Sequence, residues 1–363
     1  MESSRRVPIL GVISILLFLS FPSSMARTLS SSSNITAVFA FGDSTLDPGN
    51  NNYIPTAFRG DHSPYGRDFP GHRPTGRFSN GRLATDFIVS SLNIKNLLPP
   101  YLDPNLPDDD LITGVSFASA GMGLDDLTNH GSGVLSMNRQ LDYFDEASAR
   151  IQKKVGSEEA HRIIANAVFV ISAGTNDMLF SMYDLQTRRL EYSIETYHDL
   201  LINNLNSAIQ RLHNAGARKF AVVGHPPIGC LPVQVTMGSL FPSFHMLQRW
   251  CVDSQNHDAI RYNSKLESYL LALQSRTPGL KTAYMDVYTP LTNMIESPSR
   301  YGFSVALEGC CGTGLLEFGA ICNDISPVCP DPSRFVFFDA VHPTEAAYRN
   351  IAKNLSEDIQ QLV

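Results

Sequence analysis

The sequence predicts an α/β fold: a three-layer α/β/α sandwich around a doubly wound, mostly parallel five-stranded sheet of the flavodoxin-like type. Three observations lead to it. Five short apolar runs recur along the chain, longer segments separate them, and two of those segments carry apolar residues at helical spacing. Unbroken apolar runs are typical of strands that a parallel sheet buries on both faces. Their alternation with helices is typical of βαβ units.

The five expected strands follow one another at irregular intervals. Between the third and fourth runs, residues 197–214 place apolar side chains on one helical face, and Gly216 is expected to end that helix. Residues 260–273 repeat the pattern before the fifth run. Ligands of such folds bind beyond the carboxyl ends of the strands. The predicted strands are residues 37–41, 114–118, 167–172, 220–224 and 282–287.

Composition limits the class of protein. The 363 residues are 43% hydrophobic and 17% charged, which is typical of a globular protein with a sizeable core, and the formal net charge is −7. This acidic balance argues against a partner such as nucleic acid or an anionic membrane, since both attract basic proteins. The chain has no internal repeat, so one domain is the better interpretation.

The N-terminus has the pattern of a secretory signal. Two arginines precede the apolar residues 7–21, and a cleavage pattern of small residues ends at Ala26. An uncleaved anchor is the alternative, but spanning a bilayer takes about 20 apolar residues and this run is shorter. We expect residues 1–26 to be a signal peptide and residues 27–363 a single secreted, extracellular domain without a transmembrane segment.

Cysteine usage agrees with export. All six cysteines lie in the second half of the chain, and an even number in an exported protein favours disulfides. Zinc is the alternative, but the spacings that zinc sites use are absent from the sequence. The pairing stays open. Asn34 and Asn354 begin glycosylation acceptor motifs. The cysteines are Cys230, Cys251, Cys310, Cys311, Cys322 and Cys329.

A Gly-Asp-Ser sequence ends the first apolar run. Its serine, Ser44, lies in a strand-to-helix turn, where its own N–H would lie near a helix N-terminus and favour negative charge. The alternative is that Asp43 or Ser44 only caps the turn. The run Asn50-Asn51-Asn52 follows, and we expect it to brace the serine turn by hydrogen bonds.

Two further motifs could supply hydrogen-bond donors. Asn176 lies in Gly-Thr-Asn-Asp after the third run, and its side chain could donate to an oxyanion. An ordinary turn is the alternative. Gly121 lies shortly after the second run and offers a backbone N–H at the same edge of the sheet.

Asp339 and His342 form the last motif. A carboxylate three residues before an imidazole, in a tight turn that leads to a helix over residues 345–355, can hold one ring nitrogen and leave the other for a nucleophile. A turn in which His342 only packs or caps is the alternative. Taken together, the motifs predict a nucleophile, a base with its orienting acid, and an oxyanion hole.

The blocks FGDS, GVSFASAG, GTND and DAVHPT, in this order, resemble the GDSL esterase/lipase branch of the SGNH hydrolases. The plant secreted subgroup is closer still, because DPGNNNY, PTGRFSNGR, PPIGC and CCGTG also resemble its blocks. The resemblance covers essentially the whole mature chain. Two positions depart from it: GDST replaces GDSL, and Ser116 stands where the plant family usually has Asn.

The resemblance implies a serine esterase or lipase. It makes Ser44 the nucleophile, His342 the general base and Asp339 its partner, and it makes Ser44 N–H, Gly121 N–H and Asn176 the oxyanion donors. The expected substrate is a small-molecule or lipid ester, with neither cofactor nor metal; the oligomeric state is not predicted. An extracellular acyltransferase with the same site and a catalytically silent binding glycoprotein are the alternatives.

Overall fold

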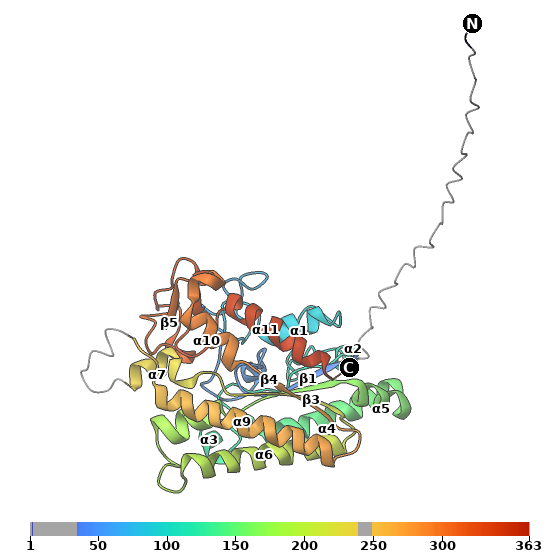
Figure 1. Ribbon diagram of the computed structural model, residues 1–363. Coiled ribbons are helices and arrows are strands. Elements are labelled where there is room, and N and C mark those ends of the chain that lie inside the picture. The colour runs from blue at the N-terminus through green and yellow to red at the C-terminus, as the bar shows by residue number, and fades with distance from the viewer. Residues whose placement is uncertain (1, 3–34, 239–248, 363) are drawn as a thin grey trace. The chain divides into compact units, whose positions relative to one another are not determined.

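A four-stranded parallel sheet lies at the centre of the computed structural model, which describes residue 2 and residues 35–238 and 249–362 (Figure 1). The strands lie side by side in the order β1-β2-β3-β4. Every residue of β1, β2 and β3 is buried, which agrees with their mainly apolar sequences. The strands are β1 (Val38–Gly42), β2 (Val168–Ser172), β3 (Lys219–Val223) and β4 (Lys281–Met285).

The predicted strand at residues 114–118 lies beside β1 but is not a regular strand. It runs parallel to β1, and the N–H of Ala40 donates to Val115 while that of Phe117 donates to Ala40. On its outer side, Ser116 pairs with the irregular segment 99–101 instead of with another strand. The sheet therefore has four regular strands and a fifth, irregular one, where the sequence predicted five.

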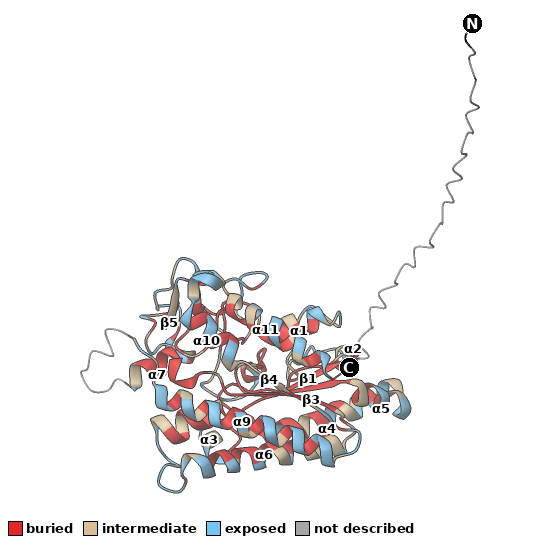
Figure 2. Cartoon of the chain, viewed as in Figure 1, coloured by how far each residue is buried: buried red, intermediate tan, exposed pale blue. Residues whose placement is uncertain are grey.

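Helices cover both faces of the sheet, so the predicted three-layer sandwich is confirmed. Figure 1 shows α4, α6 and α9 on one side of the strands and α1, α10 and α11 on the other. Their buried sides are directed toward the sheet and their exposed sides away from it (Figure 2). The helices are α1 (Ala84–Ser91), α2 (Asp108–Ile112), α3 (Asp126–Asn129), α4 (Met137–Val155), α5 (Ser157–Asn166), α6 (Ile194–Asn214), α7 (Pro232–Met237), α9 (Asp253–Arg276), α10 (Tyr288–Glu296) and α11 (Glu345–Gln360).

Both helices predicted from apolar spacing are present, and the first of them has a side-chain cap. Residues 197–214 lie in α6, which begins after Ser193, whose hydroxyl accepts the N–H of Thr196. Residues 260–273 lie in α9. Short helical turns complete the connections: η1 (Asn50–Tyr53), η2 (Asp177–Asp184), η3 (Ile228–Cys230), η4 (Pro298–Tyr301), η5 (Gly319–Ile321) and η6 (Pro332–Arg334).

An aromatic cluster packs the first strand against its neighbours. Phe41 of β1 stacks on Phe117 with ring centroids 5.1 Å apart, and Phe144 of α4 meets Phe169 of β2 edge to face at 5.4 Å. Such pairs contribute roughly 0.5–1.5 kcal/mol each beyond the burial of their area. The cluster holds the strand that precedes Ser44 rigidly in place.

A second, two-stranded parallel sheet was not predicted. It consists of β5 (Val305–Gly309) and β6 (Phe335–Phe337), and β6 leads directly to Asp339. Three disulfides account for all six cysteines, as the sequence favoured: Cys230–Cys251, Cys310–Cys329 and Cys311–Cys322. Two of them fasten the long loop between β5 and β6.

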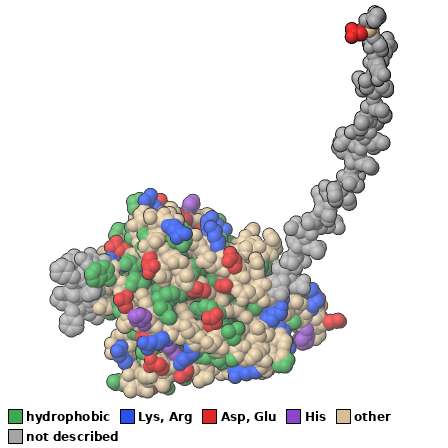
Figure 3. All heavy atoms as spheres, viewed as in Figure 1, with side chains coloured by type: hydrophobic (Ala, Val, Ile, Leu, Met, Phe, Trp, Pro, Cys, Tyr) green, Lys and Arg blue, Asp and Glu red, His purple; other side chains and the backbone are tan. Residues whose placement is uncertain are grey.

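The last features of the fold concern the predicted export signals and the surface of the chain. Apart from residue 2, the predicted signal peptide lies outside the described residues, and so does Asn34, while Asn354 is exposed on α11. Within the described ranges, no helix combines the length and apolar character needed to cross a membrane. On the face drawn in Figure 3, basic and acidic side chains are interspersed and do not gather into one large patch of either sign.

Candidate active site

Ser44 lies where the chain turns out of the sheet at the end of β1. Gly42 has a φ of 131°, and a Cβ at this position would lie 1.8 Å from the carbonyl oxygen of Ser172. Only glycine fits there. The N–H of Asp43 donates to the same carbonyl at 3.1 Å. The turn is thus fastened to β2, and Ser44, 8% exposed, follows it.

The neighbouring Asp43 caps this turn, as one interpretation of the sequence held. Its carboxylate accepts the backbone N–H of Thr45 at 3.0 Å and the Thr45 hydroxyl at 2.7 Å. Burial raises the pKa of Asp43 above its ordinary value, and the bonds from Thr45 oppose that rise. Thr45 Oγ1 also lies 2.9 Å from Ser172 Oγ. The threonine that departs from GDSL therefore adds a link between the turn and β2.

His342 reaches Ser44 across 298 positions of the chain. Its Nε2 lies 2.8 Å from Ser44 Oγ, and its Nδ1 lies 2.7 Å from Asp339 Oδ2. Asp339 is fully buried and His342 is 4% exposed. Because the Asp339 carboxylate accepts a hydrogen bond from Nδ1–H, the ring proton belongs on Nδ1. Nε2 then presents a lone pair to the serine hydroxyl.

The turn between these two residues is closed by its own carboxylate. Asp339 Oδ1 accepts the backbone N–H of Val341 at 2.8 Å and that of His342 at 2.6 Å. The N–H of Phe338 donates to the carbonyl of His342 at 2.7 Å. The ring of Phe78 packs on the imidazole with centroids 4.8 Å apart. These contacts fix the ring in one orientation.

Gly121 and Ser44 offer two backbone N–H groups to one hollow. In the part of the chain that the structure describes, neither N–H donates to a protein acceptor. Gly121 has a φ of 86°, a left-handed conformation that favours glycine. Asn176 lines the same hollow, and its Nδ2 donates one bond, at 2.9 Å, to the carbonyl of Met122. Its second N–H hydrogen has no acceptor among the residues that the structure describes.

The Asn50-Asn51-Asn52 run braces the segment that carries Gly121, as well as following the serine turn. Asn50 Nδ2 donates to the carbonyls of Ser116 and Ala118, at 2.9 and 2.8 Å. Asn51 Nδ2 donates to that of Ala120 at 2.9 Å. The prediction was a brace of the serine turn; in the described structure these side chains instead brace the segment up to Ala120, the residue immediately before Gly121.

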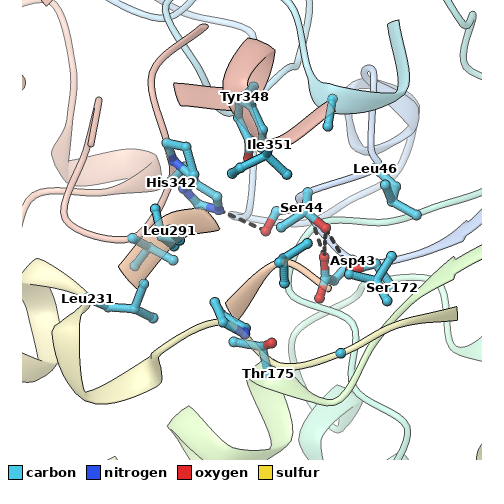
Figure 4. A pocket seen from close by; sticks show the side chains of 18 of the residues that line it. Asp43, Ser44, Leu46, Ser172, Thr175, Leu231, Leu291, His342, Tyr348 and Ile351 are labelled. Carbon is cyan, nitrogen blue, oxygen red and sulfur yellow. Dashed lines mark hydrogen bonds between the residues drawn. The ribbon is translucent and has the colours of Figure 1, made fainter. Parts of the chain in front are cut away.

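Two hollows meet at Ser44 and His342. The first, drawn in Figure 4, runs between the carboxyl ends of the strands, α10 and α11, and its walls are mainly aliphatic. The second contains Gly121 and has aromatic walls. Aliphatic residues of the first hollow include Leu46, Leu231, Leu291, Ile351 and Leu355. Aromatic residues of the second are Phe58, Phe78, Phe180 and Phe318.

A comparison with models of protein families identifies the family of this chain. Residues 38–355 match the model of the family described as GDSL-like Lipase/Acylhydrolase. The match spans β1 through most of α11 and so includes every residue of the site above. The chain belongs to this GDSL family. Its class follows from that membership: it is a hydrolase that acts on ester bonds.

Curated relatives support the assignment to the GDSL family. The chain is 52% identical over 318 residues to GDSL esterase/lipase At2g40250 of Arabidopsis thaliana, with 88% of each chain covered. It is 46% identical to GDSL esterase/lipase At2g31550 of the same plant, again with 88% of each covered. A solved lipase, Lip_vut3 from goat rumen metagenome, covers 89% of this chain and 96% of its own at 14% identity and a TM-score of 0.36. That similarity is too low to add to the argument.

Three residues near this GDSL site were missed by sequence reasoning. Gln140 of α4 fixes the end of β1, because its side-chain amide exchanges two hydrogen bonds with Gly42. Asp177 accepts bonds from the loop beyond Gly121, and Tyr65 donates to Asp339. Each acts through a partner more than 50 positions away, so no local pattern identifies it. In the described ranges, no three His, Cys, Asp or Glu side chains come together as metal ligands would.

Proposed function

We propose that this protein hydrolyses carboxylic esters through an acyl-enzyme formed on Ser44, with His342 as general base and Asp339 as its partner. The distance of 2.8 Å between Ser44 Oγ and His342 Nε2 carries the proposal. It is supported by the Asp339 carboxylate at Nδ1, which keeps the imidazole in the tautomer that can accept the serine proton. Membership of the GDSL family supplies the reaction class.

The reaction has two acyl-transfer steps. Ser44 Oγ attacks the ester carbonyl carbon while His342 Nε2 takes its proton, and the resulting imidazolium then protonates the leaving alcohol as the ester C–O bond breaks. Water next gives a proton to Nε2 and attacks the acyl carbon. The acid product leaves and Ser44 regains its proton from His342. The negative charge of Asp339 stabilises the imidazolium in both steps.

Three donors are available for the oxyanion of each tetrahedral intermediate. The N–H groups of Ser44 and Gly121 have no protein acceptor in the described part of the chain, and the Asn176 amide lines the same hollow. Fixed donors that are aimed at a developing charge cost no reorganisation when the charge forms. Because the donors lie at the second hollow, we place the ester carbonyl oxygen there.

The walls of the two hollows favour an apolar ester. Among the described residues, no Lys or Arg lines either hollow, and most lining side chains are aliphatic or aromatic. Burial of a methylene contributes roughly 0.8 kcal/mol. We therefore assign the acyl chain to the aliphatic hollow beneath Leu291 and Ile351, with the alcohol on the aromatic side.

Export is the second part of the proposal. Residues 1–26 would be a signal peptide and residues 27–363 one hydrolase domain that acts outside the cell. Three disulfides support an oxidising compartment, since the cytosol keeps thiols reduced. Mass spectrometry of the secreted chain tests this: it should begin at about residue 27 and carry glycan at Asn34, Asn354 or both. A chain that stays in the cells uncleaved would contradict it.

An ester-panel assay tests the reaction. The purified protein should release p-nitrophenol from p-nitrophenyl butyrate, and Ser44→Ala should release essentially none. Ser207→Ala is the matched control, because Ser207 is an exposed serine of α6 that bonds only within its helix. Wild-type rates in Ser44→Ala would contradict the mechanism. Inactivity of the wild-type protein on every ester would favour a binding protein, and a new ester formed from an added alcohol would favour an acyltransferase.

A further inference from the structure

The hydroxyl of Tyr65 lies between the Asp339 carboxylate and the loop that joins β5 to β6. It donates to Asp339 Oδ2 at 2.7 Å and accepts the backbone N–H of Gly319 at 2.8 Å. The ring is 1% exposed and meets Phe78 and Phe338 edge to face, with centroids 5.4 and 5.5 Å apart. A buried hydroxyl held on both sides in this way has a single orientation.

The other donors to Asp339 come from its own turn. Val341 N–H and His342 N–H bond Oδ1, and the imidazole bonds Oδ2. Among the described residues, Tyr65 is therefore the one donor from outside residues 341–342, and it bonds the oxygen that also faces His342 Nδ1. Burial raises the pKa of the Tyr65 phenol well above its ordinary value of 10.0, so the group stays protonated and remains a donor.

The loop that holds Tyr65 also holds the turn that contains Asp339 and His342. The N–H of Ala340 donates to the carbonyl of Glu317 at 2.8 Å, and the N–H of Cys311 donates to that of Phe338 at 2.8 Å. The Cys311–Cys322 disulfide closes this loop around Gly319. The loop thus contacts the turn on both sides of Asp339, through backbone bonds and through the Tyr65 hydroxyl.

We propose that Tyr65 is a positioning residue for the Ser44 reaction: it holds Asp339 Oδ2 against His342 Nδ1, and the loop closed by Cys311–Cys322 holds Tyr65. The inference rests on the proposed function. Hydrogen bonds to charged groups are stronger than neutral ones, so the Asp339 carboxylate is held less firmly against the ring when the Tyr65 bond is lost. Loss of the Tyr65 bond raises the free energy of the transition state, in which His342 becomes cationic, and leaves substrate binding unchanged.

The first test is Tyr65→Phe, which keeps the packed ring and removes only the hydroxyl. We expect kcat on p-nitrophenyl butyrate to fall by about 10- to 100-fold, while KM changes by less than about twofold. Tyr262→Phe is the matched control, because Tyr262 is fully buried in α9 and its hydroxyl has no partner in the described structure. That variant should keep the wild-type kcat. A Tyr65→Phe enzyme with wild-type kcat, or one that changes only KM or thermal stability, overturns the proposal.

The second test asks whether the loop acts through Tyr65. The double change Cys311→Ser with Cys322→Ser is made in the wild type and in Tyr65→Phe. We expect kcat to fall in the wild type and to fall much less in Tyr65→Phe, since the bond that the loop supports is already gone. Equal losses in both backgrounds would overturn the link. Ser44→Ala, assayed alongside, separates the two hypotheses: activity there would defeat the proposed function itself.

Discussion

The Asn51 side-chain amide donates to the carbonyl oxygen of Ala120 at 2.9 Å, across 69 positions of the chain. That carbonyl and the N–H of Gly121 belong to one planar peptide group, so fixing the first directs the second. Asp47 Oδ2 accepts the N–H of Ala120 at 3.0 Å and holds the same residue from its other side. The loop after Ser44 therefore orients a proposed oxyanion donor that lies far away in the sequence.

Loss of this brace should slow catalysis. Asn51→Ala removes the bond to Ala120 and leaves the Ala120–Gly121 peptide free to tilt, so we expect kcat to fall about tenfold or more with little change in KM. The control is Asn52→Ala, because Asn52 donates to Thr75 instead of Ala120. Steady-state kinetics on p-nitrophenyl butyrate compare the two variants. Equal kcat in Asn51→Ala and Asn52→Ala would show that the brace does not serve the oxyanion hole.

Asn176 should contribute more directly. Removing one oxyanion donor typically lowers kcat by about 10²- to 10³-fold, and Asn176→Ala should fall in this range. Its KM should stay close to the wild-type value, because the donor acts on charge that develops only in the transition state. The same ester assay, with circular dichroism to verify folding, measures this. A folded variant with more than half of the wild-type kcat would remove Asn176 from the oxyanion hole.

The aliphatic hollow should set acyl chain length. Leu291 of α10 lines it, and Leu291→Trp would fill space that a long chain needs. We expect kcat/KM for p-nitrophenyl decanoate to fall at least about tenfold relative to the acetate, since each buried methylene contributes roughly 0.8 kcal/mol. Assays over an acetate-to-decanoate series measure the ratio. If the variant lost the same factor on every chain length, the acyl chain would have to lie elsewhere.

Stability should depend on a buried carboxyl. Asp177 accepts bonds from the N–H groups of Leu124 and Asp125 and from the Thr128 hydroxyl, while burial raises its pKa from 3.8 to about 7. Between pH 3.8 and about pH 7, Asp177 holds a proton in the folded chain that it has released in the unfolded chain. Folding is therefore favoured at the lower pH, and this contribution disappears as the pH rises through about 7.

Urea unfolding at pH 5 and pH 8 measures the effect. The free energy of unfolding of the wild type should fall between these values by on the order of 2 kcal/mol through Asp177. Asp177→Asn cannot titrate, so its stability should fall less over the same interval, even though it is less stable at both pH values. The comparison of slopes, rather than of absolute stabilities, isolates the proton. Identical slopes would mean that Asp177 is already ionised at pH 5.

Some of this site could be predicted from the sequence because it is local. Ser44, Asn176 and Gly121 each follow an apolar run, and parallel strands bring their carboxyl ends to one edge. Asp339 and His342 share one turn, so their spacing alone indicates that they interact. These five residues could therefore be assigned to one site without knowing how the loops fold.

Other parts depend on contacts that no local pattern records. Residues 114–118 are as apolar as a strand, yet Ser116 bonds to the irregular segment 99–101 and the strand stays incomplete. The hydroxyl of Tyr65 reaches Asp339 across 274 positions, and β5 pairs with β6 across a loop held by disulfides. Such contacts depend on how long loops fold back, which periodicity and turn residues do not encode.

The central claim is that Ser44 is a nucleophile activated by His342. A fluorophosphonate probe, which reacts with activated serine hydroxyls, tests it most directly, with mass spectrometry to locate the adduct. The folded protein should carry one phosphonyl group on Ser44, and Ser44→Ala should carry none. His342→Ala should be labelled at least about 10²-fold more slowly, because it lacks the general base. A folded, hydrolytically active protein that is labelled elsewhere, or not at all, would contradict the account.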